Sequence, residues 1–367
     1  MAKGSNKTSG GDTKPKPDEK GEAATTATTS STASSKGNNG RQVPSASAAP
    51  TAAGPPRITL TGAMQTNLST LCARALDAKS AKPLLNDTWA PHVMDQVPGY
   101  DFSGVMPGPL AAAAVVKRAL TLDRWTAAFL ERNPRATVLH LACGLDSRCL
   151  RLRWGGGGGG GGGGANANTA DKPGTAAKGN FADVVWVDLD LPDVVALRRQ
   201  LLPSPSGPGC DYRLVAASVA DEGWLADIPA DRPTLILMEG LTIRRHRAIP
   251  PPAQTIQLGG GGALAFDCVG SVVLRAQGLI GVLRHTGAAF GWALDYPRYL
   301  ELLDERLRLV ETQGPLAMFG CAAESELMPL PVRWGLRGLG YVPFLYAAAE
   351  HVLRDLLTPG ALVRFEF

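Results

Sequence analysis

Thr-Val-Leu-His-Leu-Ala-Cys-Gly-Leu-Asp-Ser-Arg occupies residues 137–148 and joins an apolar run to a tight turn at Gly144. An apolar run of this kind is typical of a strand that is buried on both faces of a parallel sheet. A turn of small residues lets backbone N–H groups approach a ligand closely, and the helix that follows directs its positive end to the same place. We therefore predict a ligand site at the carboxyl edge of a parallel sheet.

Three further apolar runs follow at the spacing of an α/β fold. They occupy residues 184–190, 212–218 and 234–240, and the first and last end in acidic side chains. Asp188 and Asp190 stand where a carboxylate can accept hydrogen bonds from a ribose diol, and Glu239 ends the last run. Because the carboxyl ends of parallel strands meet at one edge, the pattern predicts an α/β fold with a doubly wound, mostly parallel sheet and an acid-lined rim.

Six motifs occur in a fixed order along the chain. They are Arg118, the pair Phe129-Leu130, the turn 142–148, the stretch Trp-Val-Asp-Leu-Asp-Leu-Pro-Asp-Val at 186–194, Ser218 to Asp221 with Trp224, and Glu239-Gly240-Leu241. Together they resemble the leucine carboxyl methyltransferase family, and within it most closely the branch of tetracenomycin polyketide O-methyltransferases. The similarity covers roughly residues 60–150, 181–243 and 263–311, with a looser match in the tail that ends at Phe367. Each motif alone is weak, but the ordered set is specific.

The resemblance implies a class I methyltransferase fold, which is Rossmann-like, with an N-terminal helical cap and a reversed edge strand. Helical patterns at 64–79, 88–97 and 110–132 would form the cap, and runs near 307–312 and 361–367 would give the reversed edge. The resemblance also implies S-adenosyl-L-methionine as the cofactor. The expected reaction is methyl transfer to a carboxylate or hydroxyl oxygen of a small, polyketide-like acceptor.

The cofactor contacts of the family are carried over to matching positions of this sequence. Arg118 matches an arginine that pairs with the cofactor carboxylate, and Asp190 matches the acid that binds the ribose. The other implied contacts are Ala142 and Gly144 in the turn, Asp146 beside it, Ser218 and Val219 next to the adenine, Glu239 after the fourth strand, and Asp188 as a second candidate for the ribose.

Several of these residues also have an ordinary structural interpretation. Asp188 and Asp190 could both cap the helix that begins near Pro192, and Arg118 could bridge to an acid on a neighbouring element. Arg148 is expected to brace the turn rather than to touch a ligand. Trp292, Tyr296 and Tyr299 are candidate pocket walls, His285 is a weak candidate for a general base, and no catalytic residue is assigned.

Two departures from the family pattern bear on activity. Ala142 stands where glycine is usual, which adds a methyl group where backbone approaches the ligand. Residues 243–262 contain three consecutive prolines and a glycine run where the family has a crossover helix, and prolines inside a helix are strongly unfavourable. The alternative interpretation is therefore a catalytically degenerate S-adenosyl-L-methionine-binding protein of the same fold.

Composition divides the chain into a tail and a folded body. Residues 1–56 are rich in Ser, Thr, Ala, Gly, Lys and Pro and have no aromatic residue, so we expect a disordered tail. The methyltransferase domain is expected at 57–367, with a disordered Gly-rich insertion at 155–180 and an irregular segment at 243–262. The tail holds seven basic and four acidic residues, so it accounts for most of the net charge of +4.

Several other function classes are disfavoured. The small charge of the body argues against nucleic-acid binding, and no apolar run is long enough for a membrane span. Six scattered cysteines and five separated histidines predict neither disulfides nor a metal site, and with no signal peptide we expect a cytoplasmic protein. A nicotinamide enzyme would need G-x-G-x-x-G at the first turn, which is absent. The oligomeric state is left open.

Overall fold

The computed structural model describes residues 62–97, 100–154, 183–207, 209–221, 223–241, 261–314, 317, 323–340, 351 and 360–367. All of them belong to the unit Pro55–Phe367. The expected tail 1–56, the insertion 155–180 and residues 243–260 of the irregular segment lie outside the described residues.

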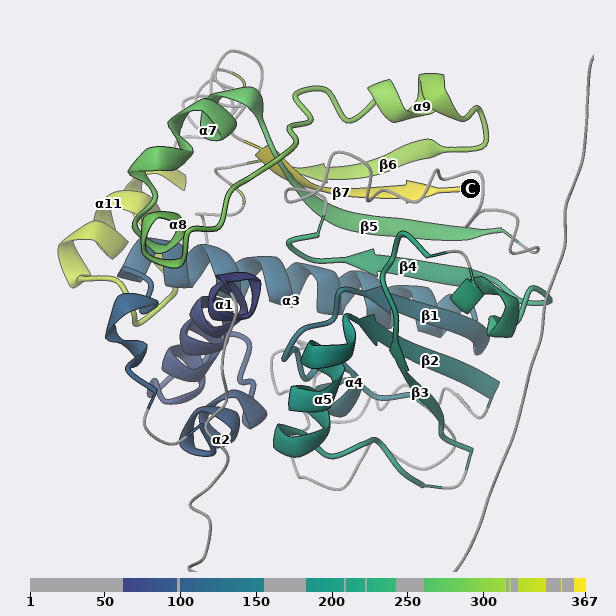
Figure 1. Cartoon of the computed structure of the whole chain (residues 1–367). Coiled ribbons are helices and arrows are strands. Elements are labelled where there is room, and N and C mark those ends of the chain that lie inside the picture. The colour runs from purple at the N-terminus through teal and green to yellow at the C-terminus, as the bar shows by residue number, and fades with distance from the viewer. Residues whose placement is uncertain are drawn as a thin grey trace, which may run out of the picture. The chain divides into compact units, whose positions relative to one another are not determined.

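Seven strands form one sheet in the order β3-β2-β1-β4-β5-β7-β6 (Figure 1). The strands are β1 (Arg135–Leu141), β2 (Asp183–Asp190), β3 (Asp211–Ala216), β4 (Thr234–Met238), β5 (Gly262–Val269), β6 (Arg308–Gln313) and β7 (Gly360–Glu366). The pairs from β3 through to β5 are all parallel. This arrangement confirms the predicted doubly wound, mostly parallel α/β sheet.

The reversed strand is β7. It runs antiparallel to both neighbours and lies between β5 and β6, with Phe266 opposite Val363 on the β5 side. The two predicted C-terminal runs therefore form a hairpin-like pair, and β6 is the outer strand of that side.

The strand order places a crevice at the carboxyl edge of the sheet. The chain starts in the middle with β1, extends to one side through β2 and β3, and then crosses to the other side with β4. The connections after β1 and β4 lead to opposite sides of the sheet, so a crevice opens at the carboxyl ends of these two strands. Ligands of α/β proteins bind in such a crevice. The turn after β1 and the end of β4 flank this opening.

Helices cover the sheet and confirm the predicted cap. The N-terminal helices are α1 (Gly62–Ala78), α2 (Trp89–Asp95), η1 (Phe102–Gly104) and α3 (Pro109–Arg132), and between the strands lie α4 (Arg148–Arg151), α5 (Pro192–Leu201) and η2 (Gly223–Asp227). The later elements are α7 (Ser271–Ala276), η3 (Gln277–Leu279), α8 (Gly281–Thr286), α9 (Tyr299–Leu303) and α11 (Leu330–Gly340). Both α3 and α5 begin with proline, which suits the first helical turn because that position needs no N–H partner.

The two faces of the sheet bury separate apolar cores. Along β1, Val138 packs on the side of α1, α3 and α5, whereas Leu139 packs on the side of η2 and α9. Alternate side chains of a strand point to opposite faces, so one apolar run supplies both cores. This explains why residues 137–141 do not alternate between apolar and exposed polar side chains.

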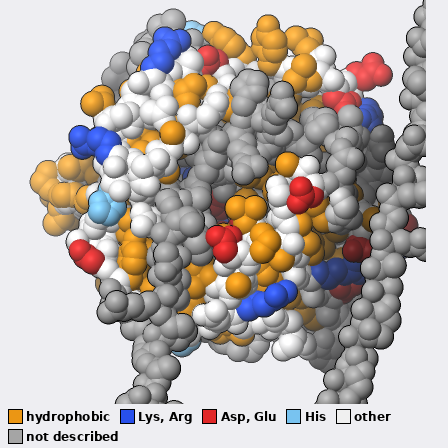
Figure 2. Space-filling model, viewed as in Figure 1, with side chains coloured by type: hydrophobic (Ala, Val, Ile, Leu, Met, Phe, Trp, Pro, Cys, Tyr) orange, Lys and Arg blue, Asp and Glu red, His pale blue; other side chains and the backbone are white. Residues whose placement is uncertain are grey.

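An apolar patch lies on the outer surface over α11. Hydrophobic side chains gather over α11 in the space-filling view, where Leu330, Val332 and Trp334 are exposed (Figure 2). None of the described helices has the length and hydropathy needed to cross a membrane.

Candidate active site

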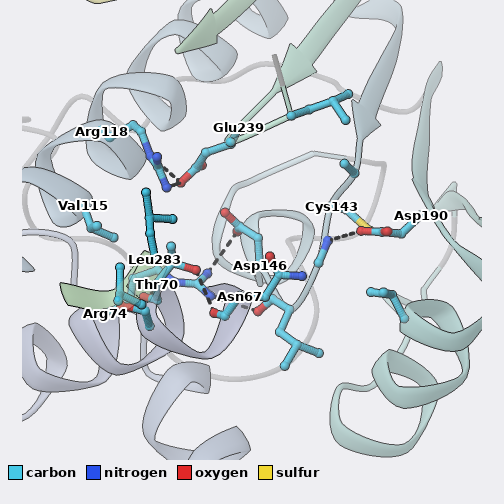
Figure 3. Close-up of a pocket in the computed structure, with 18 of the residues that line it drawn as sticks. Asn67, Thr70, Arg74, Val115, Arg118, Cys143, Asp146, Asp190, Glu239 and Leu283 are labelled. Atoms are coloured by element: carbon cyan, nitrogen blue, oxygen red, sulfur yellow. Dashed lines mark hydrogen bonds and ion pairs between the residues drawn. The ribbon is translucent and has the colours of Figure 1, made fainter. Parts of the chain in front are cut away.

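A cavity of about 670 Å³ opens at the carboxyl ends of β1, β2 and β4. Its charged side chains come from α1, α3, the turn after β1 and the ends of β2 and β4 (Figure 3). Eight of the nine predicted cofactor contacts line it, namely Arg118, Ala142, Gly144, Asp146, Asp190, Ser218, Val219 and Glu239. The ninth, Asp188, lies elsewhere.

The turn after β1 has an unusual backbone. Gly144 has a φ of 53°, in the left-handed region that favours glycine, and Ala142 has a φ of 54° in the same region. A Cβ atom on Gly144 would lie 3.1 Å from Nδ2 of Asn67 on α1. The turn is therefore tightly fitted beneath α1, and both the left-handed backbone and the limited space favour glycine at 144.

Asp190 fixes this turn to the end of β2. Its Oδ2 accepts a hydrogen bond from the N–H of Gly144 at 2.7 Å, and its Oδ1 accepts one from the N–H of Leu191 at 2.8 Å. Burial raises the pKa of the Asp190 carboxyl, and these two donors offset only part of that effect. Each carboxylate oxygen keeps a second lone pair that a ligand hydroxyl can use.

Asp188 is placed beneath the site and not in it. The side chain is fully buried and accepts hydrogen bonds from Arg198 (2.6 Å), Tyr212 (2.9 Å) and Trp186 (2.8 Å). It also meets Nδ1 of His140 at 3.2 Å. Burial raises the pKa of Asp188, but the charge of Arg198 outweighs it and holds the pKa below the usual range. Its lone pairs are used inside the protein, so of the two ribose candidates the geometry favours Asp190.

Arg118 reaches the cavity from α3 and is held by two acids. Its guanidinium donates to Oε1 of Glu239 at 3.0 Å (Figure 3) and to Oδ2 of Asp267, on β5, at 2.8 Å. Asp267 also accepts the N–H of Gly240 at 2.6 Å. The alternative that Arg118 bridges to neighbouring acids is thus observed, and it leaves the guanidinium at the cavity wall with further N–H groups for a ligand.

A buried charge network lies behind the turn. Arg148 is fully buried and donates to Asp123 of α3 at 2.7 Å and to Glu239 at 2.9 Å. Asp146 accepts from the N–H of Arg148 and from Arg151, both at 2.7 Å. As predicted, Arg148 braces the turn and does not line the cavity.

The network sets the charge of the two acids at the cavity wall. Burial raises the pKa of Asp146, but the cations of Arg148, Arg151 and Arg74 outweigh it and hold the pKa well below its ordinary value. Glu239 behaves in the same way, because Arg118 and Arg148 outweigh its burial and lower its pKa. Both acids therefore present negative charge to the cavity at neutral pH.

Ser218 and Val219 follow β3 and line the side of the cavity beyond Asp190. The hydroxyl of Ser218 accepts the N–H of Ala220 at 3.2 Å, which closes a small turn. Val219 packs against the core on the η2 side of the sheet. This wall of the cavity is therefore partly apolar.

The sequence did not reveal two groups of lining residues. Asn67, Thr70 and Arg74 lie on one face of α1 and close the cavity from that side (Figure 3). The i, i+3, i+7 spacing of these polar residues is the signal that could have shown a common face. A second group of apolar residues, from 104–115 and 280–290, forms another wall.

The expected aromatic pocket walls are wrong. Tyr296 and Tyr299 are exposed near α9, and Trp292 packs against the core beside β5. His285 is an exposed residue of α8 that does not line the cavity. Among the residues that the structure describes, no group of three His, Cys, Asp or Glu side chains is placed to hold a metal ion.

Comparison with known proteins identifies relatives of the chain. No model of a protein family matches it. It is 38% identical over 256 residues to the tetracenomycin polyketide synthesis O-methyltransferase TcmP of Streptomyces glaucescens, covering 69% of this chain and 83% of that protein. It is 36% identical over 262 residues to the S-adenosyl-L-methionine-dependent methyltransferase dpfgK of Gibberella zeae, covering 67% and 80%.

Solved structures also resemble the fold. A putative methyltransferase from Thermobifida fusca YX aligns with 80% of this chain and 93% of its own, at 16% identity and a TM-score of 0.41. The sequence relatives carry the assignment, because the identity to TcmP extends over more than two thirds of this chain. The chain belongs to the family of S-adenosyl-L-methionine-dependent methyltransferases that includes these two relatives.

Proposed function

We propose that the protein methylates an oxygen of a small, polyketide-like acceptor and binds S-adenosyl-L-methionine in the cavity at the carboxyl edge of the sheet. The observation that carries this proposal is the convergence of Asp190, Glu239 and the turn 142–146 on one cavity, although they are far apart in sequence. The name of the relative from Streptomyces glaucescens supports the polyketide-like acceptor.

The lining of the cavity fits this cofactor in shape and charge. Gly144 lines the cavity without a side chain, so its backbone can approach a ligand closely. The lining includes three carboxyl groups, on Asp146, Asp190 and Glu239, and two guanidinium groups, on Arg74 and Arg118. S-adenosyl-L-methionine carries an ammonium, a sulfonium and a carboxylate, so its net positive charge complements this excess of acids.

Each residue then has a defined task. Asp190 accepts hydrogen bonds from the ribose hydroxyls, and Ser218 and Val219 flank the adenine. Arg118 faces the cofactor carboxylate, while Glu239 and Asp146 provide negative charge for the ammonium. Asp188 and Arg148 hold these groups in place from beneath, which preserves the alignment that in-line transfer needs.

The cofactor supplies a methyl group on a positively charged sulfur, and transfer breaks the sulfur–carbon bond while the acceptor oxygen forms a new one. The protein's contribution is to orient the two molecules and to exclude water from them. A carboxylate acceptor needs no base for this step, whereas a hydroxyl acceptor must lose its proton.

Calorimetric titration with S-adenosylhomocysteine tests the proposal. We expect binding, and at about 100 times Kd the ligand should stabilise the fold by about 2.7 kcal/mol and raise Tm by several degrees. Absence of binding by both the product and S-adenosyl-L-methionine would refute the proposed site. Binding without transfer to any aromatic acid or phenol would instead favour the degenerate alternative.

A further inference from the structure

One wall of the cavity differs from the rest in polarity. Every lining residue from 104–115 and from 280–290 is a glycine or has an apolar side chain. The first segment comprises η1 and the first turns of α3, and the second comprises the start of α8 and the loop after it. The charged lining residues all come from the other walls, so polar and apolar halves are separated.

The face of α3 that lines the cavity changes from apolar to charged along the helix. Ala111, Val115 and Arg118 follow one another at i, i+4 and i+7, so they share this face. At 1.5 Å per residue, Ala111 lies about 10 Å along the helix axis from Arg118. The helix therefore runs from the apolar half of the cavity to the group proposed to face the cofactor.

The two segments of the apolar wall are packed together. A Cβ atom on Gly104 would overlap the ring of His285, so η1 and α8 are in close contact. Leu283 of α8 is 6% exposed and lines the cavity beside α1, against which α8 also packs (Figure 3). The wall is thus a continuous surface, although its halves are about 170 residues apart in sequence.

We propose that this apolar wall is the acceptor subsite, and that it takes an uncharged, apolar body carrying its reacting oxygen at one end. This inference rests on the proposed function, because it needs the cofactor at the charged half. A second charge at the far end of the acceptor would be desolvated against glycine and apolar side chains, with no partner among the described residues of this wall. A peptide would likewise leave backbone donors and acceptors unpaired.

Ala111 sets the size and polarity of this subsite. It is exposed to the cavity, lies in the first turn of α3, and carries only a methyl group. A longer side chain at 111 would project into the space assigned to the acceptor body. Leu110 is also exposed but does not line the cavity, so the same substitution there is a matched control.

The experiment compares two acids with the same ring system on the full chain saturated with S-adenosylhomocysteine. 2-Naphthoate carries one carboxylate, and naphthalene-2,6-dicarboxylate carries a second one at the far end. We expect the wild type to bind 2-naphthoate at least about tenfold more tightly. The Ala111→Arg variant should lose this preference or reverse it, because the guanidinium can pair with the second carboxylate. Leu110→Arg should retain it.

The outcomes separate this inference from the proposed function. Failure of the wild type to bind S-adenosylhomocysteine refutes the proposed function itself. If that ligand binds but both naphthalene acids bind equally, or neither binds at millimolar concentration, the acceptor subsite is wrong. If Ala111→Arg and Leu110→Arg change the preference alike, or if Ala111→Arg abolishes S-adenosylhomocysteine binding, the assignment of Ala111 is wrong.

Discussion

The backbone of Ala142 is strained because this residue has a Cβ methyl group in the left-handed region. Its φ of 54° places its Cβ close to the following carbonyl, which costs about 1–2 kcal/mol relative to glycine. We therefore expect Ala142→Gly to raise the free energy of unfolding by about 1 kcal/mol, since added freedom of the unfolded chain offsets part of the gain. Urea unfolding monitored by circular dichroism measures the change.

Ala136→Gly provides the control for this substitution. Ala136 lies fully buried in β1 with no left-handed backbone, so glycine there should lower the stability. A loss of stability in both variants would contradict strain at Ala142.

Asp190 offers a test of ligand binding at the residue scale. Asp190→Asn keeps one acceptor for Gly144 but removes the charge, so we expect S-adenosylhomocysteine to bind more weakly by about 1.5–3 kcal/mol. Asp193→Asn, at an exposed position of α5, should bind as the wild type does. Calorimetry gives both constants, and equal affinities for the two variants would remove Asp190 from the ribose site.

The same site should respond to pH. Because burial raises the pKa of Asp190, the ionised form that binds the ribose is lost as the pH falls through that raised value, above the ordinary range of about 3.9. As the pH is lowered, the affinity of the wild type for S-adenosylhomocysteine should therefore begin to fall at a higher pH than it would with an aspartate of ordinary pKa. Asp190→Asn should lack this part of the dependence.

The residues alone identified both acids of β2, and only the family resemblance ranked Asp190 above Asp188 for the ribose. Asp188 and Asp190 are two positions apart, so their side chains leave the strand on the same side. What separates them is depth, because Arg198 of α5 and Tyr212 of β3 cover Asp188, whereas Asp190 stands at the open end. Such tertiary contacts have no signature in the strand itself.

At the scale of elements, Arg148 connects three parts of the fold. It joins α4 to Asp123 of α3 and to Glu239 after β4, and it has no exposed surface. Arg148→Met would remove one of the cations of Asp123 and Glu239, which keep only Arg151 and Arg118 among the described residues, and we expect a loss of about 3 kcal/mol of stability. Chemical denaturation gives the value, with the exposed Arg153→Met as the control. A loss below about 1 kcal/mol, the range of surface pairs, would show that the network is dispensable.

The N-terminal helices were predictable and the short helices after β5 were not. The patterns at 64–79 and 110–132 correspond to α1 and α3, which contain enough turns to display an apolar face, and the pattern at 88–97 corresponds to the shorter α2. Elements α7, η3 and α8 have three to six residues each, too few to show a period. For this reason the apolar wall that α8 contributes was not foreseen, although its counterpart on α3 lies in a predicted helix.

At the scale of the whole molecule, the buried ion pairs predict sensitivity to acid. The pKa values of Asp146, Asp188 and Glu239 are lowered in the folded state, so their stabilisation is present above the unfolded values near 4 and is lost as the pH falls below them. Asp77 and Asp190 have raised pKa values and act in the opposite direction, losing stabilisation as the pH rises. Because the pKa values of Asp146 and Asp188 are shifted furthest, the free energy of unfolding should be lower at pH 3 than at pH 6.

Urea titrations at a series of pH values measure this dependence. Arg148→Met should flatten it, because Asp146 and Glu239 lose a cation that lowers their pKa values. A wild-type stability that is flat or rises toward pH 3 would contradict the charge assignment of the network.

The N-terminal segment provides a second prediction at this scale. Residues 1–56 lack aromatic side chains and are expected to add no packed core, so their deletion should change neither Tm nor the affinity for S-adenosylhomocysteine. Thermal scans of both chains decide the question, and a drop of several degrees would mean that the segment supports the fold.

The position of β7 has a consequence for how the protein is made. Within the described sheet β6 pairs only with β7, and β7 separates it from β5. During synthesis β6 leaves the ribosome about fifty residues before its partner, so that side of the sheet stays open until β7 emerges. If the ribosome stalls in this interval, the edge of β5 that pairs with β7 stays unpaired and exposes its backbone N–H and C=O groups. A chaperone could bind such an edge.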